Sequence, residues 1–221
     1  MSVRPHPGGL PLGDSGLPVI VLVGGATGTG KSTVGTEVAH RLGIRRVTST
    51  DFVRETMRAF LSREFMPSIH YSSFEVPGEN GLGGAVEGFV DQTRNVLIGV
   101  KALIERALQE RWSLVLEGVH LVPGMLAPVA GATVVHCVLA IEDEELHESH
   151  FWVRDEASGG LRPVQKYLDA LPDIRLIQDF IVDQARRSSV PVVENTDIEQ
   201  AIETVIGLVH TRAGRTSAAR T

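Results

Sequence analysis

The chain has 221 residues, of which 43% are hydrophobic and 22% charged, so it is long enough for one folded domain and is not composed like a disordered chain. Its net charge of −6 argues against a protein that neutralises many phosphates of a nucleic-acid backbone. The single cysteine, Cys137, excludes an internal disulfide and any metal site built from several cysteines.

The two ends of the chain differ in composition from its middle. Residues 1–17 are rich in Pro and Gly without an apolar segment of the signal-peptide kind, and residues 212–221 are small and polar. We expect both to be flexible tails around one domain over 18–211, located in the cytoplasm. The apolar stretch 121–141 is interrupted by Pro and Gly, so it predicts a turn and a buried strand instead of a membrane span.

Short apolar runs alternate with amphipathic segments along this domain. The expected strands are 18–25, 45–50, 112–118, 132–141 and 190–195, and the expected helices are 31–42, 51–62, 84–111, 143–154, 163–188 and 197–211. Strands rich in β-branched residues and separated by helices predict an α/β fold, a three-layer sandwich around a five-stranded parallel sheet. Ligands of such sheets bind at the carboxyl ends of the strands, so the residues that follow each strand are candidates for the site.

The first strand is followed by a glycine-rich loop that predicts a phosphate site. Gly25, Gly30, Lys31 and Ser32 match G-x-x-x-x-G-K-[ST] between a strand and a helix, which is the context that the P-loop motif requires. The fold class is therefore the P-loop NTPase type. The residues expected to bind the nucleotide here are Gly25, Thr27, Gly28, Thr29, Gly30, Lys31, Ser32 and Thr33. A dinucleotide-binding loop is the alternative. It is disfavoured because a lysine ammonium at this turn gains an ionic partner only when the ligand ends in a phosphate.

The second strand leads into a candidate catalytic carboxylate. Asp51 follows this strand, which we place beside the P-loop strand, so the carboxylate is expected to face the γ-phosphate. Arg54 and Arg58 lie three and seven positions later and therefore share one helix face with Asp51. A carboxylate followed by two guanidinium groups suits an acceptor hydroxyl whose molecule is already anionic. A plain helix N-cap at Asp51 is the alternative.

The third strand ends in Glu117, an acid in the position of the second metal-site element of P-loop enzymes. We expect Glu117 and the Ser32 hydroxyl to hold Mg²⁺. His120 follows in the next loop and is a candidate for substrate contact, with a structural role as the alternative.

After the fourth strand, basic residues surround a Gly-Gly pair, which predicts a helical lid. Arg154 is the candidate for stabilising the transferring phosphoryl group, while Arg162 and Lys166 are expected to contact substrate. An exposed pair of charged helices is the alternative. Asn195, after the last strand, is expected to contact adenine.

As a whole, the chain resembles the 2-phosphoglycerate kinase family of P-loop small-molecule kinases. The resemblance lies in "GGATGTGKSTVGTEVAHRLG", "TSTDFVRETMR", "VLEGVHLVPG" and the run from "RPVQKYL" to "VVENTD". It implies an ATP- and Mg²⁺-dependent phosphotransferase with an alcohol group as acceptor, which converts 2-phosphoglycerate into 2,3-bisphosphoglycerate. Its partner is then a small anionic phosphorylated substrate, with neither a membrane nor a long nucleic acid.

Three alternatives remain at this level: a kinase acting on another phosphorylated alcohol, a kinase acting on a polynucleotide 5′-hydroxyl, and an ATP-binding module without catalysis. The loop at 61–95 contains many turn-formers and hydroxyls, and it either lines the acceptor pocket or only covers the sheet. An ADP-release assay with different acceptors distinguishes these alternatives.

Overall fold

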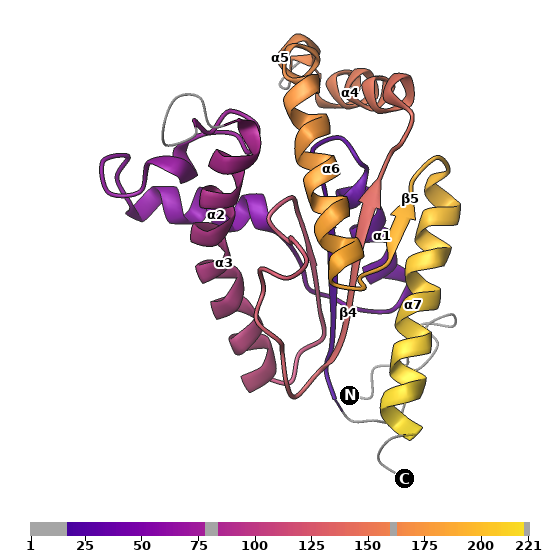
Figure 1. Cartoon of the computed structure of the whole chain (residues 1–221). Helices are drawn as coiled ribbons and strands as arrows, with labels where there is room; N and C mark the ends of the chain where they lie inside the picture. Colours follow the sequence, from indigo (N-terminus) through magenta and orange to yellow (C-terminus); the bar gives the residue numbers. More distant parts are fainter. Residues whose placement is uncertain (1–16, 78–83, 160–162, 219–221) are drawn as a thin grey trace.

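In the computed structural model, which describes residues 17–77, 84–159 and 163–218, a parallel five-stranded sheet forms the centre of the molecule. The strands are β1 (Val19–Gly25), β2 (Val47–Ser49), β3 (Leu114–Glu117), β4 (Thr133–Ala140) and β5 (Val192–Glu194). Their spatial order is β2-β3-β1-β4-β5, and neighbouring strands pair in parallel; Figure 1 shows β4 and β5 running toward the same end of the molecule. The predicted α/β fold with a five-stranded parallel sheet is confirmed.

Helices cover both faces of the sheet. They are α1 (Lys31–Arg41), α2 (Thr50–Phe60), the 3-10 helix η1 (Pro67–His70), α3 (Ala85–Gln109), α4 (Glu144–Ser158), α5 (Val164–Asp169), α6 (Leu171–Arg187) and α7 (Ile198–Ala218). Side chains of β1 alternate between the two faces: Val21 and Val23 pack with α1 and α7, whereas Ile20 and Leu22 pack with α3. This alternation, with every β1 residue buried, requires a helical layer on each side.

Two expected boundaries are wrong. The segment 163–188 is two helices, because Pro172 lacks a backbone N–H and stands in the first turn of a new helix after Ala170. The predicted C-terminal tail from residue 212 is helical over most of its length, since α7 continues to Ala218 and Ala213 is buried. The expected N-terminal tail lies almost wholly outside the described residues.

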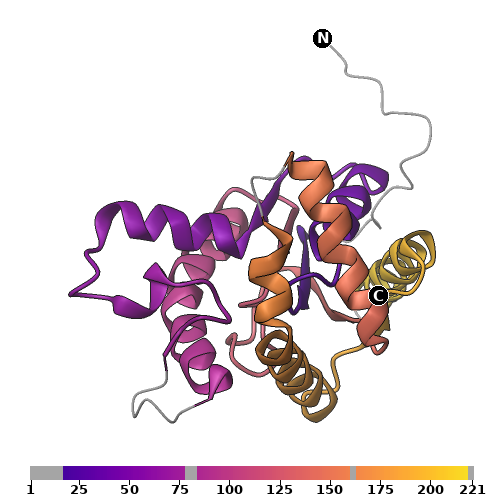
Figure 2. The same cartoon turned by 90° about the horizontal axis from the view of Figure 1, so that it is seen from above.

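The carboxyl end of the sheet is flanked by two groups of elements. Helices α2 and η1 with the start of α3 lie on one side, and α4 with α5 lies across the other, as the view from above shows (Figure 2). Strand β2 is separated from β1 by β3, so the expectation that the second strand lies beside the P-loop strand is wrong. Among the described helices, none has the length and apolarity needed to cross a membrane.

Candidate phosphotransfer site

The P-loop joins β1 to α1 and contains three glycines with positive φ. Gly25, Gly28 and Gly30 have φ values of 141°, 90° and 79°, a backbone conformation that other residues rarely adopt. Gly30 is also the N-cap of α1, so the loop leads directly into the positive end of a helix dipole. The loop therefore has the backbone of an anion cradle at the position that the sequence predicts.

Lys31 is the charged centre of this site. Its Nζ donates to the Ala26 carbonyl oxygen at 2.7 Å, which folds the side chain back over the loop. Burial lowers its pKa to about 8, while the charges of Glu117, Arg154 and Asp51 also act on it. Four predicted site residues from four different segments thus lie close enough for their charges to interact.

Asp51 lies in the first turn of α2, and its side chain is 67% exposed at the carboxyl end of the sheet. Ser49, and not Asp51, caps the helix, because the Ser49 hydroxyl accepts from the Phe52 amide at 3.0 Å. The Asp51 carboxylate is therefore not the N-cap of α2. Its carboxylate accepts from Arg54 Nε at 3.0 Å.

The two arginines of the predicted acceptor site have different surroundings. Arg54 is buried, and its Nη1 donates to the carbonyl oxygens of Ile69 at 2.8 Å and Tyr71 at 3.1 Å. It therefore holds the segment after η1 against α2 as well as orienting Asp51. Arg58 is 37% exposed, and its Nη1 donates to both carboxylate oxygens of Glu55, at 2.7 and 2.8 Å.

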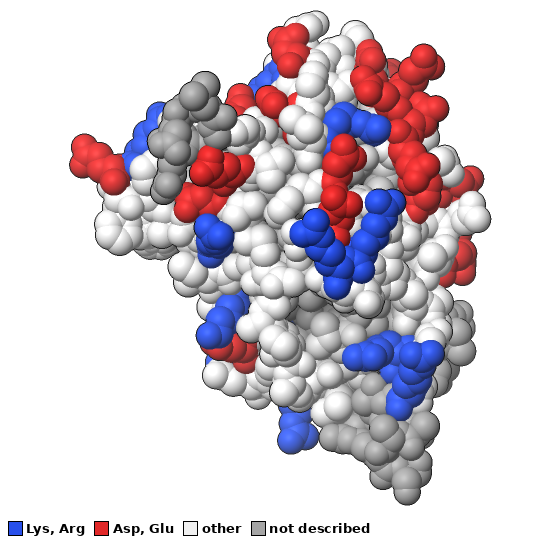
Figure 3. All heavy atoms as spheres, in the orientation of Figure 1, with Lys and Arg blue, Asp and Glu red and all other residues white. Residues whose placement is uncertain are grey.

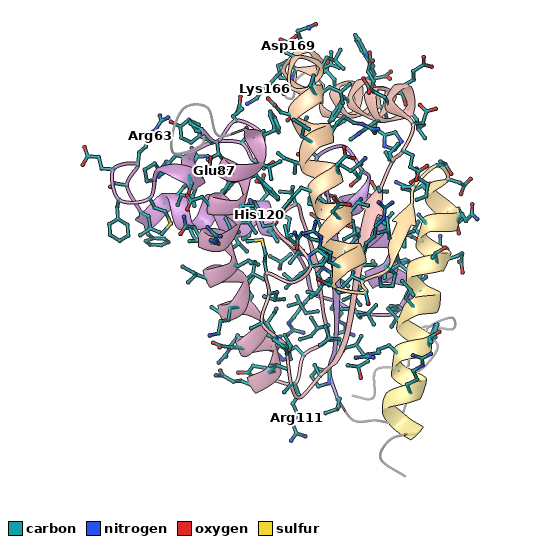
Figure 4. The ribbon with its side chains drawn as sticks, viewed as in Figure 1. Arg63, Glu87, Arg111, His120, Lys166 and Asp169 are labelled. Atoms are coloured by element: carbon teal, nitrogen blue, oxygen red, sulfur yellow. The ribbon has the colours of Figure 1, made fainter. Side chains whose placement is uncertain are left out.

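His120 is fully buried beside α3 (Figure 4), and both of its ring nitrogens have partners within the protein, so direct substrate contact stays a prediction. Its Nε2 lies 2.9 Å from Gln92 Oε1, and its Nδ1 lies 2.9 Å from Thr50 Oγ1. Because the Gln92 oxygen only accepts, Nε2 carries the proton and the Thr50 hydroxyl donates to Nδ1. Burial lowers the pKa of this ring to about 3, which keeps it neutral.

Gln92 extends the same network into the loop after η1. Its Nε2 donates to the carbonyl oxygens of Ser68 at 2.6 Å and Tyr71 at 3.0 Å. A chain of buried hydrogen bonds therefore links the residue before Asp51 to η1, through His120 and Gln92. This chain therefore connects α2, α3 and η1, the elements on the acceptor side of the site.

Glu117 and Ser32 have the surroundings expected of a magnesium site. Glu117 is buried at the end of β3 and packs against Gly35 of α1, where an added Cβ would lie 3.3 Å from the Glu117 Cβ. Ser32 stands exposed in the first turn of α1. The described residues contain no group of three or more His, Cys, Asp or Glu that would enclose a metal ion. The carboxylate of Glu117 and the hydroxyl of Ser32 are both oxygen donors, the type that Mg²⁺ takes beside phosphates and water.

The predicted lid residues lie on α4 and α5. Arg154 has its guanidinium 5.0 Å from the centre of the Tyr167 ring, and its charge reaches Lys31. Lys166 points across to the other side of the site, where its Nζ lies 3.0 Å from Glu75 Oε2 and 3.2 Å from Ser72 Oγ (Figure 4). Lys166 therefore links α5 to the segment that contains Ser72 and Glu75. Arg162 lies outside the described residues.

Asn195 is hydrogen-bonded to the backbone of the P-loop. Its side chain is buried, and its Nδ2 donates to the Thr29 carbonyl oxygen at 3.0 Å. A Cβ added at Gly30 would collide with this amide, so Gly30 is also needed for the close approach. The structure thus shows Asn195 as a support of the P-loop, and its contact with adenine stays a prediction.

A hollow of about 560 Å³ instead adjoins the P-loop between the starts of α1 and α7. Ser32, Thr33 and Thr36 line one side of it, and Ile198 and Ile202 line the other.

Two residues of α4 that sequence reasoning left out contact the P-loop directly. His147 Nε2 donates to the Thr27 carbonyl oxygen at 2.8 Å, and the Phe151 ring lies against Gly28. Their spacing of four residues, with Arg154 three residues beyond Phe151, is the helix-face signal that marks them in the sequence. The signal is weak in the sequence because the partners are backbone atoms more than a hundred residues away.

No protein-family model matches the chain, but individual proteins do. A 2-phosphoglycerate kinase of Methanothermobacter thermautotrophicus is 43% identical over 197 residues, which cover 86% of this chain and 64% of that protein. The 2-phosphoglycerate kinase of Pyrococcus horikoshii is 38% identical over 194 residues, with 86% and 64% covered. The one of Methanocaldococcus jannaschii is 36% identical over 200 residues, with 88% and 64% covered. The resemblance to 2-phosphoglycerate kinases is confirmed, and the chain spans a little under two thirds of these relatives' length.

Solved structures agree on the fold. A gluconokinase from Sinorhizobium meliloti matches with a TM-score of 0.52 at 12% identity, covering 93% of this chain and 99% of its own. A shikimate kinase from Acinetobacter baumannii in complex with shikimate matches with a TM-score of 0.50 at 19% identity, covering 88% and 94%. The fold is that of P-loop small-molecule kinases.

Proposed function

We propose that this chain transfers the γ-phosphoryl group of ATP to a hydroxyl of a small phosphorylated acceptor, and that the acceptor is 2-phosphoglycerate. The observation on which the proposal depends is the buried Lys31 ammonium at the P-loop, on which the charges of Glu117, Arg154 and Asp51 act. The curated relatives named 2-phosphoglycerate kinase support the choice of acceptor. The product would then be 2,3-bisphosphoglycerate.

Each residue of the site has a separate role in the phosphoryl transfer. The acceptor hydroxyl oxygen forms a bond to the γ-phosphorus, the bond from that phosphorus to the bridging oxygen of ADP breaks, and Asp51 takes the hydroxyl proton. Lys31 and Arg154 offset the negative charge of the phosphoryl group in flight. Arg54 orients the Asp51 carboxylate through its bond at 3.0 Å.

Ser32 and Glu117 would hold Mg²⁺, the serine directly and the glutamate through water. When bound, the ion neutralises charge on the outer phosphates. The fit follows from the buried carboxylate of Glu117 beneath the first turns of α1.

The nucleoside fits the hollow beside the P-loop. Its volume of about 560 Å³ and the apolar surface of Ile198 and Ile202 suit a base, while the charged residues of its lining, Glu37, Arg41 and Glu199, are paired with one another. Thr33, predicted to bind the nucleotide, lines it.

The acceptor belongs on the opposite side, in front of Asp51. Arg58 is the exposed cation there, and a phosphate group would compete with Glu55 for its guanidinium. A second hollow of about 690 Å³ between α5 and residues 74–76 is a poor alternative, because Glu75, Asp169 and Asp173 outnumber its one lysine. An acceptor that already has a phosphate and a carboxylate would be repelled there.

The proposal is tested by following ADP release with ATP and Mg²⁺. We expect turnover with 2-phosphoglycerate that exceeds turnover with 3-phosphoglycerate, with other phosphorylated alcohols of three to six carbons, and with a 5′-hydroxyl oligonucleotide. Release with the oligonucleotide alone would identify a polynucleotide kinase. Tight ATP binding without acceptor-dependent release would identify a non-catalytic binder and contradict the proposal.

Asp51→Asn tests the assignment of the base. The amide keeps the size of the side chain but cannot take the hydroxyl proton, so we expect kcat to fall by about 10² to 10⁴-fold. The dissociation constant of MgADP, measured by calorimetry, should stay within about twofold, because Asp51 is placed toward the acceptor. Unchanged kcat would refute the role of Asp51 as base.

A further inference from the structure

Helix α4 presents one of its faces to the P-loop. Asp143 fixes the start of the helix by accepting from the Leu146 amide at 2.8 Å. From there, His147, His150, Phe151 and Arg154 follow at the spacing of a single helix face. The outward face is acidic, as Figure 3 shows over α4. The helix therefore turns its acids to solvent and its imidazoles toward the loop.

Both imidazoles donate to backbone carbonyls of the P-loop. His147 Nε2 lies 2.8 Å from the Thr27 oxygen, and His150 Nδ1 lies 2.9 Å from the Gly28 oxygen. Because a carbonyl only accepts, these two ring nitrogens carry the protons. His147 is fully buried, and burial lowers its pKa to about 4, so it stays a neutral donor near pH 7.

The two bonds fix the direction of two peptide planes. In a trans peptide the C=O and the N–H point in opposite directions. Holding the oxygens of Thr27 and Gly28 toward α4 therefore turns the N–H groups of Gly28 and Thr29 toward the interior of the loop. The Thr29 amide makes a long contact of 3.4 Å with the Ala26 oxygen there, the same oxygen that holds Lys31. These are the groups that a phosphate oxygen would meet.

The close contact between α4 and the P-loop also explains why residue 28 is a glycine. A Cβ at Gly28 would lie 2.6 Å from a Phe151 ring atom and 2.8 Å from His147 Nε2, so a side chain there would push α4 away. His147 stacks on Phe151 with ring centres 5.4 Å apart, and Phe151 stacks on Tyr167 of α5 at 5.2 Å. The His147 imidazole is thus held in place by a column of rings.

We propose that His147 and His150 are positioning residues that hold the P-loop in its phosphate-binding orientation before the nucleotide arrives. This inference rests on the proposed function, because it requires that the loop bind a nucleotide. A glycine-rich loop without these bonds would have more conformations, and ordering it would reduce the affinity for the ligand.

The test is calorimetric binding of MgADP to the full chain. His147→Leu and His150→Leu should each raise the dissociation constant by about five- to tenfold, the effect of one lost hydrogen bond. His147→Gln and His150→Asn place an amide donor near the lost ring nitrogen and should restore binding to within about threefold. Val153→Ala, an exposed position on the same helix, is the control and should bind as the wild type does.

Steady-state kinetics distinguish positioning from a general loss of structure. The KM for ATP should rise in the leucine variants while the KM for the acceptor stays within about twofold, whereas partial unfolding would affect both. His150 is only partly buried, so His150→Leu decides the question if His147→Leu does not fold. Leucine variants that bind MgADP like the wild type would contradict the positioning role of His147 and His150 and leave the proposed function untouched. A wild-type chain that binds no MgADP would overturn the proposed function as well.

Discussion

Lys31 combines burial and charge in one side chain. Its pKa of about 8 means that part of the ammonium has already lost its proton slightly above neutral pH. Burial is the main cause, and it is only partly offset by the carboxylates of Glu117 and Asp51. Polyphosphate binding should restore the full charge, because the bound anion favours the protonated form.

This gives a prediction for the pH dependence of binding. The lysine is protonated below its pKa and neutral above it, so MgADP affinity should fall as pH rises from 7 to 9. At pH 8.5 binding should take up roughly 0.8 proton, against roughly 0.1 at pH 7. Calorimetry in two buffers of different ionisation enthalpy measures this number. Equal affinity at pH 7 and 9, without proton uptake, would contradict the prediction.

At the scale of elements, the acceptor side is attached to the sheet by apolar packing, in which Val53 and Ile69 are buried, and by a set of polar contacts. Arg54 of α2 and Gln92 of α3 both donate to the Tyr71 carbonyl, and Gln92 also accepts from His120 of the loop after β3. Buried groups of this kind are costly when a partner is lost, because each remaining group keeps its desolvation penalty. The position of η1 therefore depends on these hydrogen bonds as well as on the burial of Ile69.

Gln92→Leu removes three of these bonds without changing the size of the side chain greatly. It leaves the Ser68 and Tyr71 oxygens and the His120 N–H with one partner fewer, so we expect the free energy of unfolding to fall by about 3 kcal/mol. Urea denaturation measures the loss. Gln109→Leu, an exposed glutamine at the end of the same helix, is the matched control and should change stability by less than about 0.5 kcal/mol. An equal loss in both variants would contradict the role of the network.

At the scale of the whole molecule, burial of neutral histidines links stability to pH. His120 and His147 have pKa values of about 3 and about 4, and the ordinary value in the unfolded chain is about 6.5. Between pH 6.5 and 4 the unfolded chain therefore binds protons that the folded chain does not. Stability is highest above pH 6.5 and is lost as the pH falls.

Each histidine should lower the free energy of unfolding by about 1.4 kcal/mol per pH unit in this range. We expect the urea midpoint to fall steeply from pH 6.5 to pH 5. His147→Gln removes one of the two titrating rings and should reduce the slope by about half. A midpoint that does not change over this range would contradict the neutral state of both rings.

The sequence by itself determined the five strands, the P-loop and the place of Asp51 at the start of a helix. Periodicity, β-branched runs and the spacing from Gly25 to Ser32 are local patterns, and the backbone follows them directly. The break between α5 and α6 was also readable in principle, because Pro172 stands there.

Only the tertiary structure decided which polar residues face a ligand and which support the site. Arg54, His120 and Asn195 have the residue types of binding groups, yet their partners are Ile69, Gln92 and Thr29, which the fold brings to them from other segments. The strand order that places β3 between β1 and β2 likewise depends on how helices pack across the sheet. Burial and hydrogen-bond partners are properties of contacts distant in the chain, which no local pattern specifies.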